Sequence, residues 1–154
     1  MLKQSPKMLN ISKKANQNYL AKVIRIDNLV PIEGADKIQK TFIHGDQCII
    51  SKNVQINDIC IYFPLECAIS RKYLSYSNSF EKKENNRDPE VKGFFGKHGR
   101  VRAVKLRKIP SLGYLVPVAS LQEWLEHEKN TKLSINWEDL VGTEFDYFDD
   151  IFIC

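Results

Sequence analysis

Short apolar segments separated by turn residues dominate the pattern from residue 19 to residue 118. The first segment, residues 19–26, is rich in β-branched side chains and ends before Asn28 and Pro31. Its alternation of apolar and polar positions slips once, between Val23 and Ile24, and this slip predicts a β-bulge. The pattern therefore predicts that the ordered chain begins with a β-strand.

A hairpin and several further strands are predicted after this first strand. Residues 38–43 and 47–51 flank the short glycine-containing connection at residues 44–46, which is typical of a β-hairpin. Residues 59–63 form another apolar segment that stops at a proline, and strand-like patterns resume later in the chain, at residues 100–108 and 113–118. Short strands at this spacing favour a small β-barrel or sandwich.

Two polar segments interrupt or precede the strand pattern. Residues 1–17 are rich in lysine and show little apolar periodicity, so we expect a mobile basic arm. Residues 71–92 mix serine, asparagine and charged residues, which predicts a long exposed insertion. The predicted division is an arm at 1–17, a barrel at 18–118 that carries the insertion, and a helical and strand extension at 119–154.

The extension begins with Ser120-Leu-Gln-Glu123, which has the sequence of a helix capping box. Apolar residues spaced by three and four positions after it predict a short helix with one apolar stripe. A second helical turn is expected at residues 137–141, capped by Asn136 and stopped by Gly142. The last residues, 144–154, are too apolar for a free tail, so we expect them to pack on the barrel or on the helix.

The composition fits an intracellular globular protein, with 43% hydrophobic and 27% charged residues. Neither a secretory signal nor a segment of the roughly 18 apolar residues needed to span a membrane is found, which predicts a cytoplasmic protein without membrane partners. The four cysteines, at positions 48, 60, 67 and 154, show no C-x-x-C spacing. Reduced cysteines are therefore expected, without a zinc or redox motif.

The charge is unevenly distributed although the net charge is only +4. Residues 91–122 carry seven lysines and arginines and no acid, whereas residues 137–154 carry six acids and no base. Such segregation indicates that one surface meets an anion.

The basic residues of segment 100–108 would share one face of a strand if a bulge separates Ala103 from Val104, because Val101, Ala103, Val104 and Leu106 would then point inward. Cations that follow phosphates and aromatic rings that stack on bases are typical of nucleic-acid binding. The alternative is a solvated strand face with two phenylalanines in the core. The predicted nucleic-acid-binding residues are Phe94, Phe95, Lys97, Arg100, Arg102, Lys105, Arg107, Lys108 and Tyr114.

Other chemistry is weakly represented. The glycines around Lys97 lack the G-K-[ST] sequence of a phosphate loop. The three histidines have no partners at metal-ligand spacing, and Asp36 fits a turn cap better than a catalytic carboxylate. No serine, cysteine or lysine has the surroundings of an activated nucleophile, so no catalytic or metal-binding residue is predicted.

Segments 31–38, 54–62, 100–107, 111–118 and 139–146, in this order, resemble the OB-type module at the amino end of certain ATP-dependent RNA ligases. The glycine-alanine-aspartate loop is also similar to tRNA-binding OB domains of some tRNA synthetases. The resemblance implies a mainly β, small OB-like barrel with a long loop insertion and a short C-terminal helical and strand extension.

In that ligase family a nucleotidyltransferase domain with a K-x-[DHN]-G motif follows the module. This sequence has no such motif, so the resemblance implies binding without catalysis in this chain. ATP and a divalent metal are implied only for the catalytic domain, in cis or in trans, and the implied partner is RNA or a nicked duplex. A free-standing tRNA- or single-strand-binding protein and a protein-interaction module are the alternatives.

Overall fold

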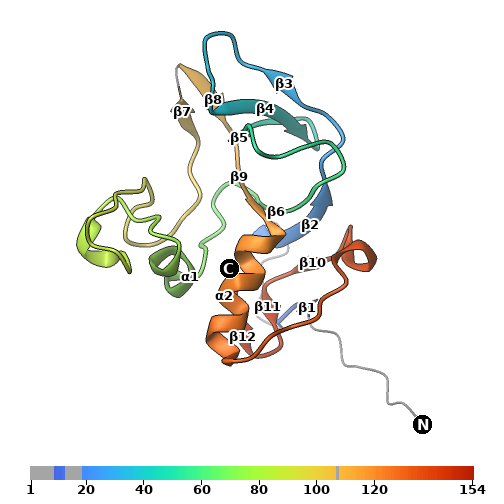
Figure 1. The fold of residues 1–154 in the computed structure, drawn as a ribbon, viewed down its shortest axis with the longest axis vertical. Helices are drawn as coiled ribbons and strands as arrows, with labels where there is room; N and C mark the ends of the chain where they lie inside the picture. Colours follow the sequence, from blue (N-terminus) through green and yellow to red (C-terminus); the bar gives the residue numbers. More distant parts are fainter. Residues whose placement is uncertain (1–8, 13–18, 107) are drawn as a thin grey trace.

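The computed structural model describes residues 9–12, 19–106 and 108–154, and the mainly β architecture predicted from the sequence is confirmed (Figure 1). The largest sheet is antiparallel with the order β10–β2–β6–β9. It consists of β10 (Glu144–Phe145), β2 (Ala21–Arg25), β6 (Ile59–Phe63) and β9 (Tyr114–Pro117).

Three smaller antiparallel sheets complete the β structure in the described residues. One is formed by β3 (Val30–Pro31), β4 (Ile38–Ile43) and β5 (Asp46–Ser51), and one by β7 (Val104–Leu106) and β8 (Ile109–Ser111). The last is formed by β1 (Leu9–Asn10), β11 (Tyr147–Phe148) and β12 (Ile151–Phe152).

The sheet β2–β6–β9 is covered on both faces. Val23 and Ile61 belong to a helix-side core, which also includes residues of the α helices and of the C-terminal strands. Ile24 and Cys60 belong to a barrel core, which is enclosed with β4 and β5. β2 pairs with β6 residue for residue, with Val23 opposite Ile61 and Ile24 opposite Cys60. The predicted bulge is therefore wrong. Val23 and Ile24 are both apolar because each is buried in a core on a different face of the sheet.

The hairpin β4–β5 agrees with the sequence prediction. Its strands pair from Ile38 opposite Ser51 to Ile43 opposite Asp46. The turn consists of His44 and Gly45, with φ values of 52° and 87°. Two residues with positive φ are what a tight turn that matches the strand twist requires.

The helix α2 (Val118–Lys129) presents the predicted apolar stripe, since Leu121, Trp124 and Leu125 are buried. The predicted capping box is wrong. The helix begins directly after β9 with Pro117 as its N-terminal cap residue, and no side chain caps it. The hydroxyl of Ser120 instead lies 2.8 Å from the hydroxyl of Tyr73, so it ties α2 to the insertion.

The insertion at residues 71–92 is more structured than the predicted exposed loop. It contains α1 (Arg71–Tyr76) and a short 3-10 helix, η2 (Lys83–Asn85). The side chain of Asn86 is buried, where it donates to the carbonyl oxygens of Phe80 and Val91 at 2.9 and 2.8 Å and accepts from the Phe80 amide at 2.8 Å. Hydrogen bonds from polar side chains to the backbone thus stabilise the insertion in place of strand pairing. Tyr73, Leu74 and Phe80 are buried within it.

The predicted mobile arm is wrong for the part that the structure describes. β1 pairs with β11, with Leu9 opposite Phe148, and Leu9 is buried. The backbone N–H and the hydroxyl of Ser12 donate to the two carboxylate oxygens of Asp146, at 2.8 and 2.7 Å. Residues 1–8 and 13–17 of the predicted arm lie outside the described residues. The strand partner of Leu9 is distant in sequence, so local periodicity carries no signal for it.

The C-terminal run packs on the molecule as the sequence predicts, with one exception. Phe145, Phe148 and Ile153 are fully buried in the helix-side core. Phe152 is 44% exposed and contacts the ring of Tyr147, with ring centroids 5.6 Å apart. The prediction that Phe152 is buried is wrong because it lies on the edge strand β12, on the face turned away from Ile151 and Ile153.

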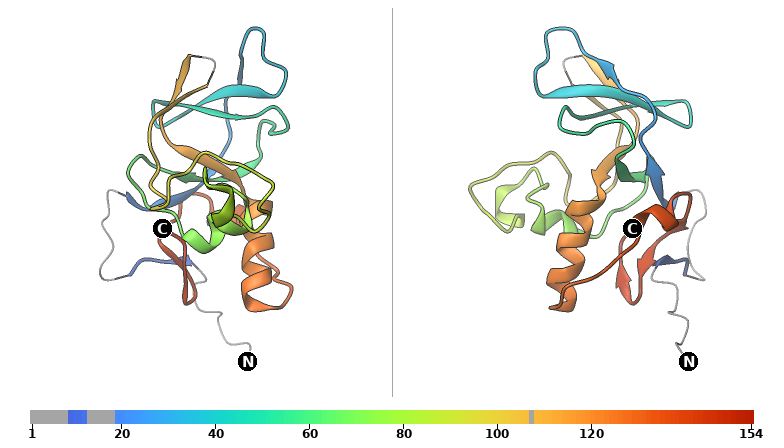
Figure 2. Two further views of the ribbon diagram at one scale, coloured as in Figure 1. Left: turned by 90° about the vertical axis from the view of Figure 1, so that its left-hand side faces the viewer. Right: turned by 45° about the vertical axis from the view of Figure 1, so that its right-hand side comes forward.

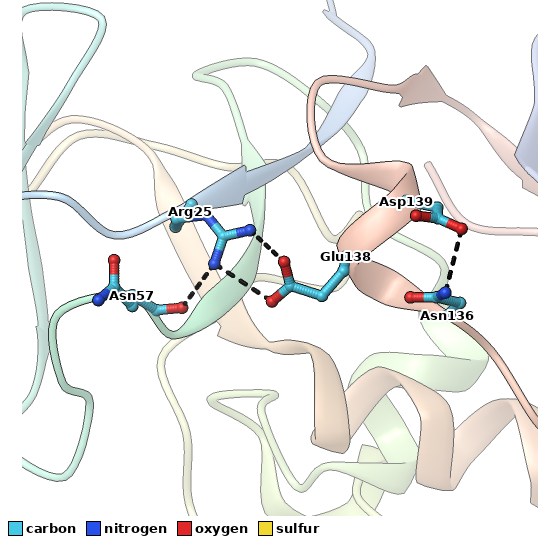
Figure 3. A network of polar contacts seen from close by, with 5 residues as sticks. All are labelled: Arg25, Asn57, Asn136, Glu138 and Asp139. Atoms are coloured by element: carbon cyan, nitrogen blue, oxygen red, sulfur yellow. Dashed lines mark hydrogen bonds and ion pairs between the residues drawn. The ribbon is translucent and has the colours of Figure 1, made fainter.

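The second predicted helical turn is the 3-10 helix η3 (Trp137–Leu140). The predicted cap by Asn136 is wrong, since no side chain caps this helix; the side-chain amide of Asn136 instead donates to the carboxylate of Asp139 at 3.0 Å. Glu138 instead forms a bidentate ion pair with Arg25 at the end of β2, and Arg25 also donates to the carbonyl oxygen of Asn57 at 3.2 Å (Figure 3). The hydrogen bond from Arg25 lowers the pKa of Glu138. The network joins the C-terminal extension to the barrel.

Candidate nucleic-acid interface

A groove of about 300 Å³ opens at the mouth of the barrel, between the hairpin β4–β5 and the chain that leads from Phe94 to Leu106. Its floor is apolar, since Ile50, Val54 and Leu115 both line the groove and belong to the barrel core. The groove is therefore an opening onto the barrel core, with walls contributed by β5, by β9 and by residues 94–106.

Three aromatic side chains stand together at one wall of the groove. Phe94 and Phe95 are stacked with ring centroids 4.9 Å apart, and Tyr114 meets both rings edge-on, at 5.8 and 4.9 Å. Phe95 is only 4% exposed, whereas Phe94 is 56% exposed. Phe95 is therefore a core residue, as the alternative interpretation of the sequence expected for both phenylalanines. Phe94 is the ring that is accessible to a ligand.

Tyr114 supports the exposed ring from β9. Burial raises the pKa of its phenol, so the hydroxyl stays neutral at physiological pH and keeps its proton for hydrogen bonding. Among the predicted site residues, the structure brings five together at the groove: Phe94, Phe95, Arg100, Arg102 and Tyr114.

The two arginines of the groove differ in their partners. Arg100 donates to the carbonyl oxygen of Glu66 at 3.0 Å, and the Glu66 carboxylate lies 3.8 Å away, so part of its charge is already compensated. Arg102 is exposed and has no ion-pair partner among the described residues. Arg102 is therefore the less compensated of the two arginines that line the groove.

The remaining predicted cations lie outside the groove lining. Lys97, Lys105 and Lys108 are exposed, and Lys108 adopts a positive φ of 68° in the turn between β7 and β8. Arg107 lies outside the described residues. Lys37, directly before β4, lines the groove and was missed by the sequence prediction, because the hairpin that brings it there is distant along the chain from residues 94–106.

The predicted single bulged strand at residues 100–108 is wrong. The backbone of residues 99–101 hydrogen-bonds to residues 66–69, whereas β7 starts only at Val104 and pairs with β8. Ala103, predicted to point inward, is exposed. Val104 and Leu106 do line the groove, although Leu106 is 42% exposed. The chain changes partner between residues 101 and 104, which a bulge cannot achieve.

The position of Phe94 depends on a close approach of two backbones. The amides of Phe94 and Phe95 both donate to the carbonyl oxygen of Ser79, at 2.9 and 2.8 Å, and the Gly93 amide donates to Phe80 at 2.8 Å. A Cβ atom on Gly93 would lie 2.3 Å from the carbonyl carbon of Ser79. Only glycine fits here without moving the insertion away from the aromatic wall.

We expect Gly93→Ala to destabilise the protein by about 1–3 kcal/mol, because the clash is with backbone atoms that cannot rotate away. Chemical denaturation measures the loss. Gly96→Ala is the matched control in the same loop, since a Cβ there meets no atom within 4 Å. Equal stability of the two variants would contradict the close approach.

Other candidate chemistry does not converge in the described part of the chain. No group of three or more histidine, cysteine or acidic residues is arranged to hold a metal ion there. All four cysteines are free, and burial raises the pKa of both Cys48 and Cys60 to about 12, so these thiols stay protonated. Among the described helices, none has the length and apolar character to cross a bilayer.

Comparison with protein families identifies residues 20–118 with a family described as an OB-fold domain. No curated protein matches the chain. Among solved structures, a Naegleria gruberi RNA ligase variant with ATP and manganese is similar at 24% identity and a TM-score of 0.48, covering 82% of this chain and 35% of that chain. The Naegleria gruberi RNA ligase with pyrophosphate is similar at 26% identity and a TM-score of 0.45, with the same coverage.

The chain therefore spans about a third of the length of these RNA ligase structures. The family match, in contrast, covers most of the chain and includes every strand that forms the groove.

Proposed function

The chain belongs to the OB-fold domain family, and we propose that it binds single-stranded nucleic acid in the groove at the mouth of its barrel. The observation that carries the proposal is the exposed ring of Phe94, which packs against Phe95 and Tyr114 in the groove that Arg102 also lines. An exposed phenylalanine supported from behind offers a flat surface on which a base can stack. A cation at the same opening can meet the adjoining phosphate.

The apolar floor favours bases over a phosphate backbone alone. A binder that only follows phosphates needs a polar groove, whereas Ile50, Val54 and Leu115 offer apolar surface directly beneath the aromatic wall. Because every base has a flat π-face, such a groove would tolerate many sequences. The proposed binding is therefore weak in sequence preference and strongly dependent on salt.

We also propose that the module serves an RNA ligase by gripping RNA or a nicked duplex. This proposal rests on the resemblance of segments 31–38, 54–62, 100–107, 111–118 and 139–146, in this order, to the OB-type module of that family. Catalysis would belong to a nucleotidyltransferase domain in cis or in trans, which would use ATP and a divalent metal. RNA repair and nick sealing would be functions of that proposed assembly, and this chain would contribute only nucleic-acid binding.

The salt dependence of RNA binding tests the role of the basic residues. Each phosphate contact contributes a slope of about −0.7 to a plot of log K against log salt for single strands. We expect the double variant Lys37→Ala/Arg102→Ala, which removes two cations that line the groove, to flatten this slope by about 1.4, that is, two contacts of 0.7 each. Fluorescence anisotropy with a labelled oligoribonucleotide at several salt concentrations measures it.

The matched control is Lys83→Ala/Lys132→Ala, which removes the same charge from exposed positions outside the groove. This control is expected to keep the wild-type slope. If both double variants change the slope equally, only the overall charge matters. If the wild-type protein shows no affinity for RNA at low salt, the groove is an interface for protein partners instead.

A further inference from the structure

A second concavity, of about 450 Å³, lies between the insertion and α2. The insertion projects beside the barrel and its helix α1 lies next to α2 (Figure 2). This concavity shares no lining residue with the groove. It is lined by charged and aromatic side chains, among them Arg71, Lys72, Tyr76, Arg87, His127 and Glu128.

The charge of this second concavity is positive. Arg71, Lys72 and Arg87 contribute three cations, and Glu128 is the one carboxylate of the lining. Glu128 lies 4.0 Å from the ammonium group of Lys72 and so compensates one cation in part. In the described part of the chain neither Arg71 nor Arg87 has a carboxylate within 4.0 Å. Both guanidinium groups thus belong to exposed residues and lack a carboxylate partner at ion-pair distance.

The arginines are held by aromatic rings. The guanidinium carbon of Arg87 lies 4.0 Å from the ring centroid of Tyr76, and that of Arg71 lies 6.0 Å from the ring of Phe80. The Tyr76 ring also contacts His127, at 5.0 Å, and its hydroxyl donates to Glu123 at 3.0 Å. A guanidinium that already rests on a ring loses less conformational freedom when it binds an anion.

The backbone around these side chains is fixed as well. The Arg87 amide donates to the carbonyl oxygen of Ser75 at 2.8 Å, so the far end of the insertion is tied to α1. The Asp88 amide donates to the side-chain oxygen of Asn78 at 2.8 Å. Arg71 and Arg87, sixteen positions apart in sequence, are thereby held on the same concavity.

We propose that this concavity is a phosphate-binding site in which Arg71 and Arg87 form the principal contacts and Lys72 assists. Planar guanidinium groups donate two parallel hydrogen bonds to phosphate oxygens, which suits a phosphate monoester better than a single point charge does. The phosphate can be free in solution or can be the 5′-terminal phosphate of a nucleic-acid strand. The site does not depend on the groove.

Two-dimensional NMR of the ¹⁵N-labelled protein tests the site, with inorganic phosphate as the first probe. Phosphate is expected to shift the amide signals of α1, of residues 85–88 and of His127. The double variant Arg71→Gln/Arg87→Gln is expected to weaken binding about tenfold or more, since two hydrogen bonds between charged groups are lost. Glu128→Gln is expected to tighten binding about twofold to fivefold by removing the repulsive carboxylate.

Lys82→Gln/Lys83→Gln is the matched control, because it removes two exposed cations from the same insertion outside the concavity. A second probe pair, an oligoribonucleotide with a 5′-phosphate and the same strand with a 5′-hydroxyl, distinguishes the sources. A preference for the phosphorylated strand assigns the site to strand ends. Shifts with inorganic phosphate but with neither strand assign it to free phosphate, and equal shifts with both strands would contradict a site for phosphate monoesters.

Equal phosphate binding by the wild type, by Arg71→Gln/Arg87→Gln and by the lysine control would overturn the proposed site. The gain expected for Glu128→Gln keeps this test valid even if the double arginine variant folds poorly. Phe94→Ala leaves the second concavity intact and is expected to keep its phosphate shifts. A failure of RNA binding in the groove is thereby separable from a failure of this site.

Discussion

Replacing Phe94 with alanine is expected to weaken the binding of single-stranded RNA by about 1–3 kcal/mol, which is roughly 5- to 150-fold, because one base loses its stacking surface. The fold should be unaffected, since the Phe94 side chain is 56% exposed while Phe95 keeps the wall closed. Fluorescence anisotropy at constant low salt measures the change, and the slope against salt should stay that of the wild type.

Two variants control for this result. Phe94→Tyr keeps an aromatic face and is expected to bind within about twofold of the wild type. Phe152→Ala removes another exposed ring, which does not line the groove, and is expected to bind like the wild type. If Phe94→Ala binds RNA normally, the aromatic wall is not the surface on which bases stack.

Phe145→Ala is expected to lower the free energy of unfolding by about 3–5 kcal/mol, the usual cost of removing a large ring from a close-packed core. Phe145 is fully buried and stands opposite Ala21, where β10 joins the edge of the main sheet. Against a total stability of about 5–15 kcal/mol for proteins of ordinary size, this is a large fraction. Denaturation by urea, followed by tryptophan fluorescence, measures the loss.

Phe152→Ala provides the comparison within the same C-terminal run, with an expected loss below about 1 kcal/mol because its ring is partly in solvent. A similar, small loss in both variants would mean that residues 144–154 do not form part of the core.

The elements that the sequence predicts well have local causes. The hairpin β4–β5 follows from alternating strands around His44 and Gly45, which tolerate the positive φ of a tight turn. The stripe on α2 follows from the spacing of Leu121, Trp124 and Leu125. Of the site, Phe94, Arg102 and Tyr114 could be predicted because a charge run, a glycine loop and the next strand lie close together in sequence.

The elements that were predicted wrongly depend on distant partners. Asn86 was interpreted as exposed because it is polar, yet its side-chain amide is buried and donates hydrogen bonds to the carbonyl oxygens of Phe80 and Val91. Ser120 fits a capping box, but its hydroxyl contacts Tyr73 of the insertion. Leu9 pairs with a strand near the other end of the chain. Local secondary-structure propensity depends only on neighbours in the sequence, so it cannot predict any of these contacts.

The sheet β2–β6–β9, which contributes alternate side chains to both cores, has a consequence for the way the molecule unfolds. If these strands separate, the barrel core and the helix-side core are exposed together, so neither half retains an interior of its own. Loss of the groove and loss of the packing around α2 should then be a single cooperative event. The groove consequently has the same free energy of unfolding as the whole molecule. A ligand bound in the groove therefore also stabilises the distant C-terminal strands.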